Sequence, residues 1–351
     1  MHDLVRIYAG DCAEHDETSE YRDSALRRFI DHYLFTAYGS DRLIAEYRRP
    51  IDIGSPVEGS NPIELPDDPA AMGWFSIEHS NMLAVQRLAG SRNLLDRVWQ
   101  FAWVLDNFHW RRGHIYDDIA TWSAGLDAAQ RMEKPFEIGL AHRRLGRAYG
   151  RAKRYDLALE HMTAGLRMAE AAHDVPGQAH SQRIVSWIYQ MLDENSAALA
   201  HARASLELYR SLANPVWEAH ALNQLGECHM RLGEYGTARE NCAKAYALHN
   251  EYRHTAGEAE SLTSLGAISL LMGQDEDAVR YYRDALKEYR RLGNTYDEAI
   301  VLEHLGGALV KLDQRAEADE SWRQALELYT MSHRKSDADR VAALLNQAGR
   351  V

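Results

Sequence analysis

Apolar and small residues recur along this chain with a period of 40 residues, and five copies align without an insertion. In one copy, apolar residues stand at helical spacing from Leu265 to Met272, Gly273 interrupts the pattern, and the spacing resumes at Ala278. Each copy therefore predicts two antiparallel helices joined by a short turn. The apolar position that anchors the alignment is occupied by Leu145, Val185, Leu225, Leu265 and Leu305.

Small side chains occupy two further positions in every copy. Where two helices cross, a small residue lets the backbones approach to about 8–10 Å. One such pair of helices cannot bury its own apolar face, so neighbouring pairs must stack on one another. The two small positions hold Gly146, Ser186, Gly226, Gly266 and Gly306, and Ala158, Ala198, Ala238, Ala278 and Ala318.

The segments that flank the five copies are mostly helical in pattern. Residues 19–45 carry an apolar helical face and predict one helix, or two helices that are separated by a break at Gly39-Ser40. The dense prolines of residues 50–69 exclude a helix there, and helix resumes at Asp67 with acids followed by proline. The predicted division is a terminal segment (1–16), a helical N-terminal segment (17–92) with its proline-rich loop (50–69), a degenerate helical pair (93–136), five regular repeats (137–335) and a capping helix (336–351).

The repeat resembles the tetratricopeptide repeat. That family has an ordered series of aromatic, Leu-Gly, Tyr, Ala, aromatic and Ala positions, and the period here exceeds its usual length of about 34 residues. The resemblance implies an all-α fold: a right-handed α-solenoid of helical hairpins, with helices longer by about a turn, preceded by a small helical N-terminal segment. The matching residues in the first copy are Leu145, Gly146, Tyr149, Ala158, Met162 and Gly165.

Composition narrows the functional classes. The chain has 351 residues and a formal net charge of −12, which argues against a general nucleic-acid binder. Its three cysteines, Cys12, Cys228 and Cys242, form no CxxC pair, so we expect neither a disulfide framework nor a thiolate zinc site, and a reduced cytoplasmic setting. No apolar run approaches the roughly 18–20 residues that span a bilayer, so we expect no contact with a membrane.

Two stretches resemble a narrower group. MHDLVRIYA at residues 1–9 and AMGWFSIEHSNMLAVQRLA at residues 71–89 are similar to the C-terminal sensor region of actinobacterial signal-transduction ATPases, the SARP-type, NB-ARC-containing antibiotic regulators. In that family, sequences like MHDLVR close a winged-helix segment, so residues 1–16 resemble its remnant. The chain has no GxxxxGK[ST] loop, so nucleotide and DNA binding are expected only in a longer parent or a partner protein. The chain is either a segment of such a regulator or a stand-alone relative.

The sequence contains no recognisable catalytic or metal-binding motif. The HExxH, GxSxG, GxGxxG and EF-hand patterns are missing, so we expect no enzyme, no catalytic residue and no cofactor. The 17 histidines are scattered, and we interpret them as polar helix-surface residues rather than as metal ligands. Cys228 and Cys242 fall on the two helices of one repeat, where we interpret them as small core residues.

The candidate site is the concave face of the array. In the tetratricopeptide geometry the first helix of each pair lines a groove, and its inward positions here carry several Arg and Trp residues. These side chains dominate binding hot spots through bidentate contacts and large desolvated areas. The alternative is that the arginines are solvated or paired with acids of neighbouring helices. The candidate residues are Trp103, Asn107, Trp110, Arg111, Arg143, Arg147, Arg151, His180, Arg183, Trp187, Gln190, His220, Asn223 and Arg231.

Together these patterns predict a non-enzymatic interaction and sensor module. Its expected partner is a protein or peptide, with an acidic ligand favoured by the groove arginines. Through that ligand it would regulate a linked or partner ATPase-type transcriptional regulator, as the family resemblance implies. The alternative is a passive scaffold or oligomerisation arm, whose groove is filled by its own N-terminal helices or by another subunit.

Overall fold

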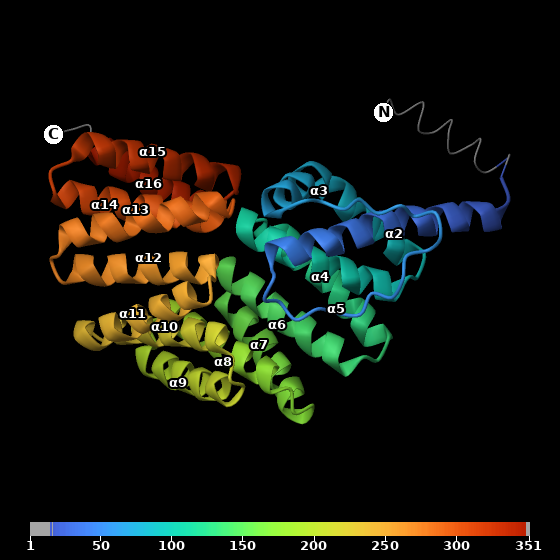
Figure 1. Cartoon of the computed structure of the whole chain (residues 1–351), viewed down its shortest axis with the longest axis horizontal. Coiled ribbons are helices and arrows are strands. Elements are labelled where there is room, and N and C mark those ends of the chain that lie inside the picture. The colour runs from blue at the N-terminus through green and yellow to red at the C-terminus, as the bar shows by residue number, and fades with distance from the viewer. Residues whose placement is uncertain (1–14, 16, 349–351) are drawn as a thin grey trace. The chain divides into compact units, whose positions relative to one another are not determined.

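The computed structural model describes residue 15 and residues 17–348, and within these residues the regular structure consists of helices α2 to α16 (Figure 1). This confirms the predicted all-α class. The chain divides into two compact units, residues 1–108 and residues 109–351. The remnant predicted at residues 1–16, which includes Cys12, lies outside the described residues apart from residue 15.

The N-terminal unit is built on α2 (Ser19–Ile44), α3 (Asp68–Ser91) and most of α4 (Leu95–Arg112). Of the one or two helices predicted here, the structure has one, because α2 continues through Gly39 and the Ser40 hydroxyl donates to the Thr36 carbonyl over 2.8 Å. The predicted start of α3 is confirmed, since the Asp67 side chain accepts from the backbone N–H of Ala70 and a proline stands in the first turn.

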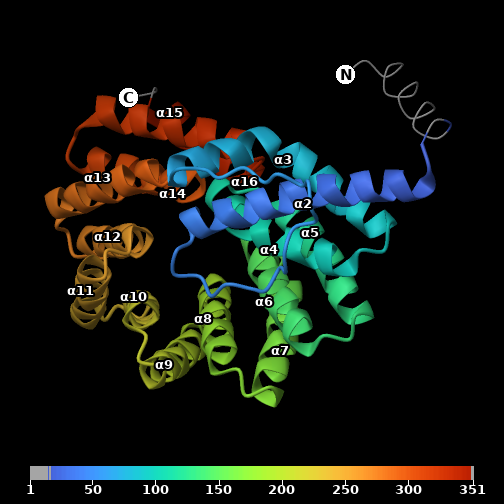
Figure 2. The same cartoon turned by 45° about the vertical axis from the view of Figure 1, so that its right-hand side comes forward.

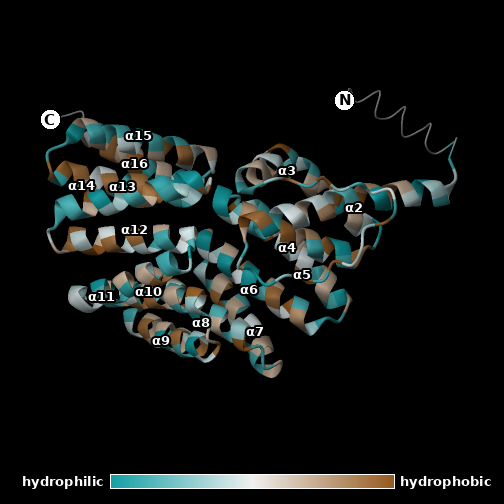
Figure 3. Cartoon of the chain, in the orientation of Figure 1, coloured by the Kyte–Doolittle hydropathy of each residue, from teal (hydrophilic) through white to brown (hydrophobic). Residues whose placement is uncertain are grey.

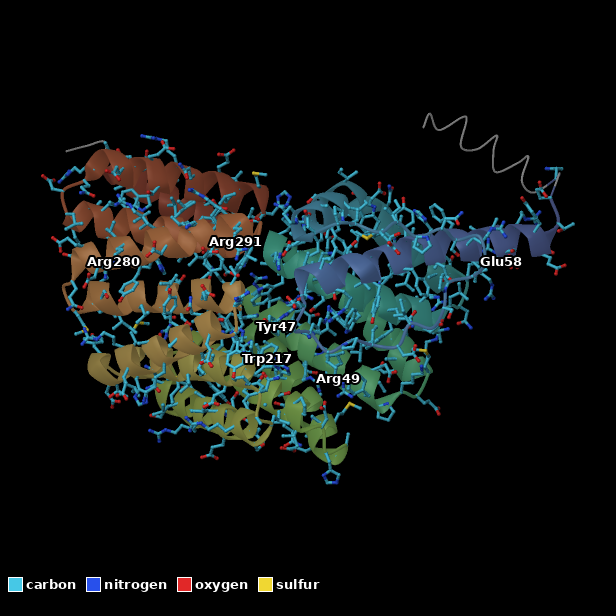
Figure 4. The ribbon with its side chains drawn as sticks, in the orientation of Figure 1. Tyr47, Arg49, Glu58, Trp217, Arg280 and Arg291 are labelled. Carbon is cyan, nitrogen blue, oxygen red and sulfur yellow. The ribbon has the colours of Figure 1, made fainter. Side chains whose placement is uncertain are left out.

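The proline-rich segment between α2 and α3 has no helix or strand among its described residues. Side chains of α2 bind its backbone instead: an Asp31 carboxylate oxygen accepts from Val57 N–H over 2.9 Å, and the Thr36 hydroxyl accepts from Ile63 N–H over 2.9 Å. Buried polar side chains of α2 therefore satisfy backbone groups that no secondary structure pairs. Figure 4 labels Tyr47, Arg49 and Glu58 along this segment.

The repeat unit has a strictly regular construction. Each helix from α5 (Ile115–Arg131) to α15 spans 17 residues, and three residues separate it from the next, so that a helical pair returns every 40 residues. The other bounds are α6 Pro135–Arg151, α7 Tyr155–Ala171, α8 Val175–Met191, α9 Asn195–Ser211, α10 Pro215–Arg231, α11 Tyr235–Glu251, α12 Thr255–Leu271, α13 Asp275–Arg291, α14 Thr295–Lys311, α15 Arg315–Met331 and α16 Lys335–Ala348.

The three-residue linkers share one backbone conformation. The middle residue has a positive φ in each, for example +59° at Lys153, +79° at Gly233 and +71° at Gly273. The next residue turns its N–H back to the helix, as when Arg154 N–H donates to the Tyr149 carbonyl over 2.9 Å. This left-handed C-cap satisfies carbonyls that the helix leaves without partners, and it explains why Gly273 interrupts the apolar pattern.

The small residues stand where the two helices of a pair cross. A Cβ atom at Gly146 would lie 2.5 Å from the sulfur of Met162, and one at Gly306 would lie 2.3 Å from Nε1 of Trp322. In the copy that has Ser186 at this position, its hydroxyl donates to the Ala198 carbonyl over 2.8 Å. The predicted reason for the small residues, close approach of the two backbones, is therefore confirmed.

The helical pairs of the repeat unit follow one another along an arc (Figure 2). The first helices of consecutive pairs contact each other, α6 with α8, α8 with α10, α10 with α12 and α12 with α14. They therefore form the inner face of the curve, while the second helices α7, α9, α11, α13 and α15 lie outside. Hydrophobic and hydrophilic residues alternate along the helices (Figure 3). No described helix is long and apolar enough to cross a membrane.

Candidate functional site

The structure assigns the candidate residues to both units. Trp103 and Asn107 belong to the N-terminal unit. The guanidinium of Arg48 stacks on the Trp103 ring at 3.6 Å, and the Asn107 amide donates to a carboxylate oxygen of Asp41 over 2.8 Å. These contacts hold the N-terminal unit together. The remaining candidates all lie in the repeat unit.

Two of the groove arginines are paired with acids of neighbouring helices. Arg143 lies 3.4 Å from a carboxylate oxygen of Asp174, and Arg147 lies 3.8 Å from one of Asp118 and stacks on the Trp110 ring at 4.5 Å. Both arginines are buried, and burial lowers the pKa of Arg143. A buried guanidinium is stable only with a compensating partner, so these two residues follow the alternative in which acids neutralise them.

Two other arginines join the ends of the repeat unit. The guanidinium of Arg151 lies 3.6 Å from the Trp110 ring and 3.3 Å from the Tyr296 ring, and it donates to the Trp110 carbonyl over 2.8 Å. Arg111 donates to the carbonyl of Leu292 over 3.1 Å. The first helices of the array therefore contact α14 and the linker that precedes it, and the inner face is bounded by these contacts.

Three more candidates serve packing or surface pairing. The Trp187 ring covers Gly150, where a Cβ atom would lie 2.4 Å from it. The Gln190 amide is buried and donates to the sulfur of Cys228 over 3.1 Å. Arg231 is exposed and lies 3.3 Å from a carboxylate oxygen of Asp193. Cys228 and Cys242 are both buried and free, which confirms their interpretation as core residues rather than as a disulfide.

Arg183 on α8 differs from the paired arginines. Among the described residues no carboxylate lies within ion-pair distance of it, and its buried Nε has no hydrogen-bond partner. Its guanidinium lies 6.0 Å from the ring of Trp217, which Figure 4 labels on α10. His180 packs edge-on against the same ring at 4.2 Å, and its Nδ1 is 2.7 Å from the Tyr209 hydroxyl. A cation and a large aromatic face thus lie beside the imidazole of His180, which is hydrogen-bonded to the buried Tyr209 hydroxyl of α9.

A chain of buried polar groups continues from there across α10 and α12. The Asn223 amide donates to the Ser264 hydroxyl over 3.1 Å, and this hydroxyl donates to a carboxylate oxygen of Glu227 over 2.8 Å. Burial, and then the nearby charge of Glu260, raise the pKa of Glu227 to about 7. Because the Glu227 carboxyl titrates near neutral pH, the charge of this face depends on pH in the physiological range.

His220 contacts two further histidines, His249 and His254, which the sequence analysis interpreted as helix-surface residues. Its ring centroid lies 4.6 Å from that of His249 on α11 and 5.1 Å from that of His254, which caps α12. Burial lowers the pKa of His249 to about 2, and those of His220 and His254 to about 3, so all three imidazoles are neutral at pH 7. The sequence held a signal for this cluster, because His249 stands where three of the four other copies have a tyrosine: Tyr209, Tyr289 and Tyr329.

The outer face carries a shallow groove of about 640 Å³ between α9, α10 and α11. Apolar residues such as Leu222 and Leu248 form its floor, and Arg210, Glu218 and Lys244 form its polar rim. Arg210 and Glu218 already pair with each other at 2.9 Å.

Comparison with known proteins identifies the repeat. Residues 137–211 and 217–291 match the family model of the tetratricopeptide repeat. The chain contains tetratricopeptide repeats. The regulatory protein AfsR of Streptomyces griseus is 28% identical to it over 192 residues, which are 54% of this chain and 20% of that protein. The chain thus spans about a fifth of the length of this relative, and its resemblance to the sensor region of actinobacterial regulators is confirmed.

Two solved structures have the same fold. A Rap protein complexed with Competence and Sporulation Factor matches with a TM-score of 0.57 at 14% identity, covering 94% of this chain and 98% of that chain. NprR in complex with its cognate peptide NprX matches with a TM-score of 0.56 at 14% identity, covering 78% of this chain and 83% of that chain. At this level of identity the likeness shows the fold alone, and it confirms the predicted solenoid of tetratricopeptide-type hairpins.

Proposed function

We propose that this chain is a non-enzymatic sensor module that binds a peptide, or a segment of a protein, on the inner face of its repeats. In this function, ligand binding changes the state of a linked or partner regulator of the ATPase type. The similarity to AfsR supports the regulatory context, and the Rap and NprR complexes support a peptide as the ligand, since both of those proteins were solved with one.

The observation that carries this proposal is the environment of Arg183. Arg143 and Arg147 already have carboxylate partners, whereas no described carboxylate pairs with Arg183. A guanidinium that is partly desolvated and beside a tryptophan gains most from an added anionic group, because charge-assisted bonds are about twice as strong as neutral ones. The ligand therefore places a carboxylate, either its C-terminus or an acidic side chain, against Arg183.

The neighbours of Arg183 suggest the rest of this subsite. The Trp217 ring offers apolar area for a side chain that follows the carboxylate, and the His180 imidazole beside it is held in place by the buried Tyr209 hydroxyl at 2.7 Å. Aromatic and arginine side chains at the centre of a contact surface supply most of the binding energy in typical interfaces. The proposal therefore keeps an acidic ligand, with one arginine as its main anchor instead of the six candidate arginines.

The alternative function is a scaffold or oligomerisation arm. It is favoured by the contacts of Arg111 and Arg151 with Leu292 and Tyr296, through which residues of the chain itself join the two ends of the repeat unit. In that case the polar groups of the inner face serve only to stabilise the curvature. The two functions differ in whether a small peptide binds with a defined stoichiometry.

The test is capture followed by direct binding. The purified chain is used to capture peptides from a library that presents each sequence both as a free acid and as a C-terminal amide. Synthetic copies of the enriched sequences are then titrated by calorimetry. We expect saturable binding at one site, weaker by about ten- to a hundredfold when the carboxylate that meets Arg183 is removed. A library that yields no saturable binder favours the scaffold.

A further inference from the structure

Three histidine side chains from different parts of the repeat unit point at one spot. His220 lies on α10, His249 on α11 and His254 in the linker at the start of α12. Each offers a ring nitrogen, and the three nitrogen atoms lie within 4.8 Å of one another. We propose that His220, His249 and His254 bind a single transition-metal ion, with Zn²⁺ as the best fit.

The spacing of the rings matches a tetrahedral site. With Zn–N bonds of about 2.0–2.1 Å, two imidazoles on adjacent corners of a tetrahedron have ring centroids about 5.2 Å apart. The observed separations are 4.6 Å for His220 and His249, 5.1 Å for His220 and His254, and 5.2 Å for His249 and His254. Small side-chain rotations therefore suffice to coordinate an ion, and the helices need not move.

His249 gives an independent reason to expect a ligand. Its side chain is completely buried, and neither of its ring nitrogens has a hydrogen-bond partner in the part of the chain that the structure describes. Burying polar groups without partners costs free energy, and such groups are rare in folded proteins. The His249 ring packs against Gly257. A Cβ atom at Gly257 would lie 2.2 Å from Cε1 of His249, so only a glycine at this position leaves space for the imidazole. A metal ion would satisfy one of these two nitrogens.

The groups around the cluster resemble the outer layer of known zinc sites. Nδ1 of His220 lies 2.7 Å from a carboxylate oxygen of Glu260, which leaves Nε2 of His220 for the metal. Metal-binding histidines in proteins commonly donate their other nitrogen to a carboxylate in this way. His254 accepts from Gly257 N–H over 3.1 Å as the cap of α12. Coordination would compete with this cap, so metal binding is coupled to the start of α12.

The charges nearby select the class of metal. The positive charge of Arg183 near His220 and His249, and that of Arg111 near His254, disfavour a bound cation. The negative charge of Glu260 favours one. Mg²⁺ and Ca²⁺ depend on several oxygen ligands, which this cluster does not supply. Imidazole nitrogens bind Zn²⁺, Cu²⁺ and Ni²⁺ strongly without such charge. We therefore expect a site with three imidazoles, in which a water completes the coordination of Zn²⁺ and Glu260 stays on Nδ1 of His220.

The test uses the full chain and the metal alone. After treatment with a chelator and removal of the chelator, Zn²⁺ is titrated by calorimetry, and X-ray absorption is recorded on the loaded protein. We expect one equivalent of Zn²⁺, nitrogen and oxygen ligands at about 2.0–2.1 Å, and no sulfur ligand. Zn²⁺ should raise the melting temperature of the chain, because it binds the folded state, and Mg²⁺ should leave it unchanged.

Two variants decide whether the cluster is the site. His254→Asn removes an imidazole but keeps a side chain that caps helices well, and His249→Gln removes the buried ring. We expect each to weaken Zn²⁺ binding at least about tenfold. The control is His161→Asn on α7, outside the cluster, which should bind Zn²⁺ like the wild type. If His254→Asn melts as a folded protein and binds Zn²⁺ with unchanged affinity, or if sulfur appears among the ligands, the proposal is wrong. Because this test needs no peptide, its result is independent of the proposed sensor function.

Discussion

The guanidinium of Arg151 on α6 lies 3.3 Å from the ring centroid of Tyr296 on α14, although 145 positions separate the two residues in the sequence. Arg334 lies 4.0 Å from the same ring, so that two cations flank one tyrosine. Repeat arrays are normally held by contacts between neighbouring pairs alone. This contact instead joins pairs from the two ends of the unit, and it fixes the curvature that brings the inner faces together.

The first prediction follows from this contact. Tyr296→Leu keeps an apolar side chain but removes the aromatic face, and a desolvated cation–π pair contributes up to about 2 kcal/mol. We expect the variant to lose about 1–2 kcal/mol of unfolding free energy in urea, and to show a larger radius of gyration by X-ray scattering. Tyr116→Leu is the control, because that ring is 69% exposed. Equal losses in both variants would argue against closure of the unit by Tyr296.

The second prediction compares two adjacent glycines of α14. A Cβ atom at Gly306 would lie 2.3 Å from the Trp322 ring, whereas a Cβ at Gly307 would meet nothing within 4 Å. Gly306→Ala should therefore destabilise the protein by about 1–3 kcal/mol through overpacking. Gly307→Ala should stabilise it by up to about 1 kcal/mol, because alanine favours the helix. Thermal and urea unfolding measure both, and a destabilisation by Gly307→Ala would show that the helix crossing is not where we place it.

The third prediction concerns the last helix, α16. Its Val341 is completely buried against the preceding pair, and Arg340 lies 2.6 Å from a carboxylate oxygen of Glu303. Deletion of residues 337–347 should expose the apolar face of the last pair and promote self-association. Size-exclusion chromatography with light scattering would detect the larger species. A monodisperse sample with an unchanged melting profile would contradict the assignment of α16 as a cap.

The fourth prediction is a pH dependence that originates at Glu227. Its pKa in the folded protein is about 7, above the usual 4.5, so the folded state binds more protons than the unfolded state between these values. Stability should then fall as the pH rises through this window. The variant Glu227→Gln should not show this decrease in stability. Relative to the variant, the unfolding free energy of the wild type should decrease by on the order of 1–3 kcal/mol between about pH 5 and pH 8.

Urea unfolding at several pH values measures this difference. Glu170→Gln on the exposed side of α7 is the matched control, and its stability should run parallel to that of the wild type. If the Glu227→Gln and wild-type curves are also parallel from pH 5 to pH 8, the carboxyl of Glu227 does not titrate in this range.

The helical pairs and their crossings could be predicted from the sequence, because they depend on local spacing. Gly146 and Ala158 stand where the two helices of a pair cross, and this position does not depend on the curvature of the array. Gly273 ends a helix because its backbone adopts a positive φ. The partners of the inner-face residues depend on the curvature itself. Nothing near Arg147 in the sequence indicates that Asp118, from a different pair, would neutralise it. Likewise, His249 and His254 approach His220 only after α10, α11 and α12 have packed.

The predicted division of the chain into five parts stays a prediction. One of its helices, α4, shows what a sequence pattern cannot reveal. The sequence pattern predicts a helix from Leu94 to Arg111, and the structure has α4 at Leu95–Arg112. The same helix contributes Trp103 to the N-terminal unit and Trp110 to the repeat unit. A pattern within one helix cannot reveal this double role, because each tryptophan is placed by the arginine that stacks on it, Arg48 and Arg151 respectively.

The fifth prediction separates Arg147, which has an acidic partner in the fold, from Arg183, which we propose as the anchor of the ligand. Arg147→Ala removes a partner of the buried Asp118 and should cost on the order of 3 kcal/mol of stability. Arg183→Ala removes no ion pair and should leave the melting temperature within a few degrees of the wild type, yet weaken binding of a captured acidic peptide by about ten- to a hundredfold. Arg203→Ala on the exposed face of α9 is the control for general charge.

The salt dependence of binding tests the same residue in a second way. Because screening shortens the reach of exposed charges to about 8 Å at physiological ionic strength, binding of the peptide to the wild type should weaken as salt increases. The loss should be smaller in Arg183→Ala, since the cation that meets the carboxylate is gone, and unchanged in Arg203→Ala. If Arg203→Ala weakens the binding as much as Arg183→Ala does, general surface charge explains the attraction. If salt has no effect on the wild type, the inner face does not recognise an acidic group, because a contact between Arg183 and a carboxylate must respond to screening.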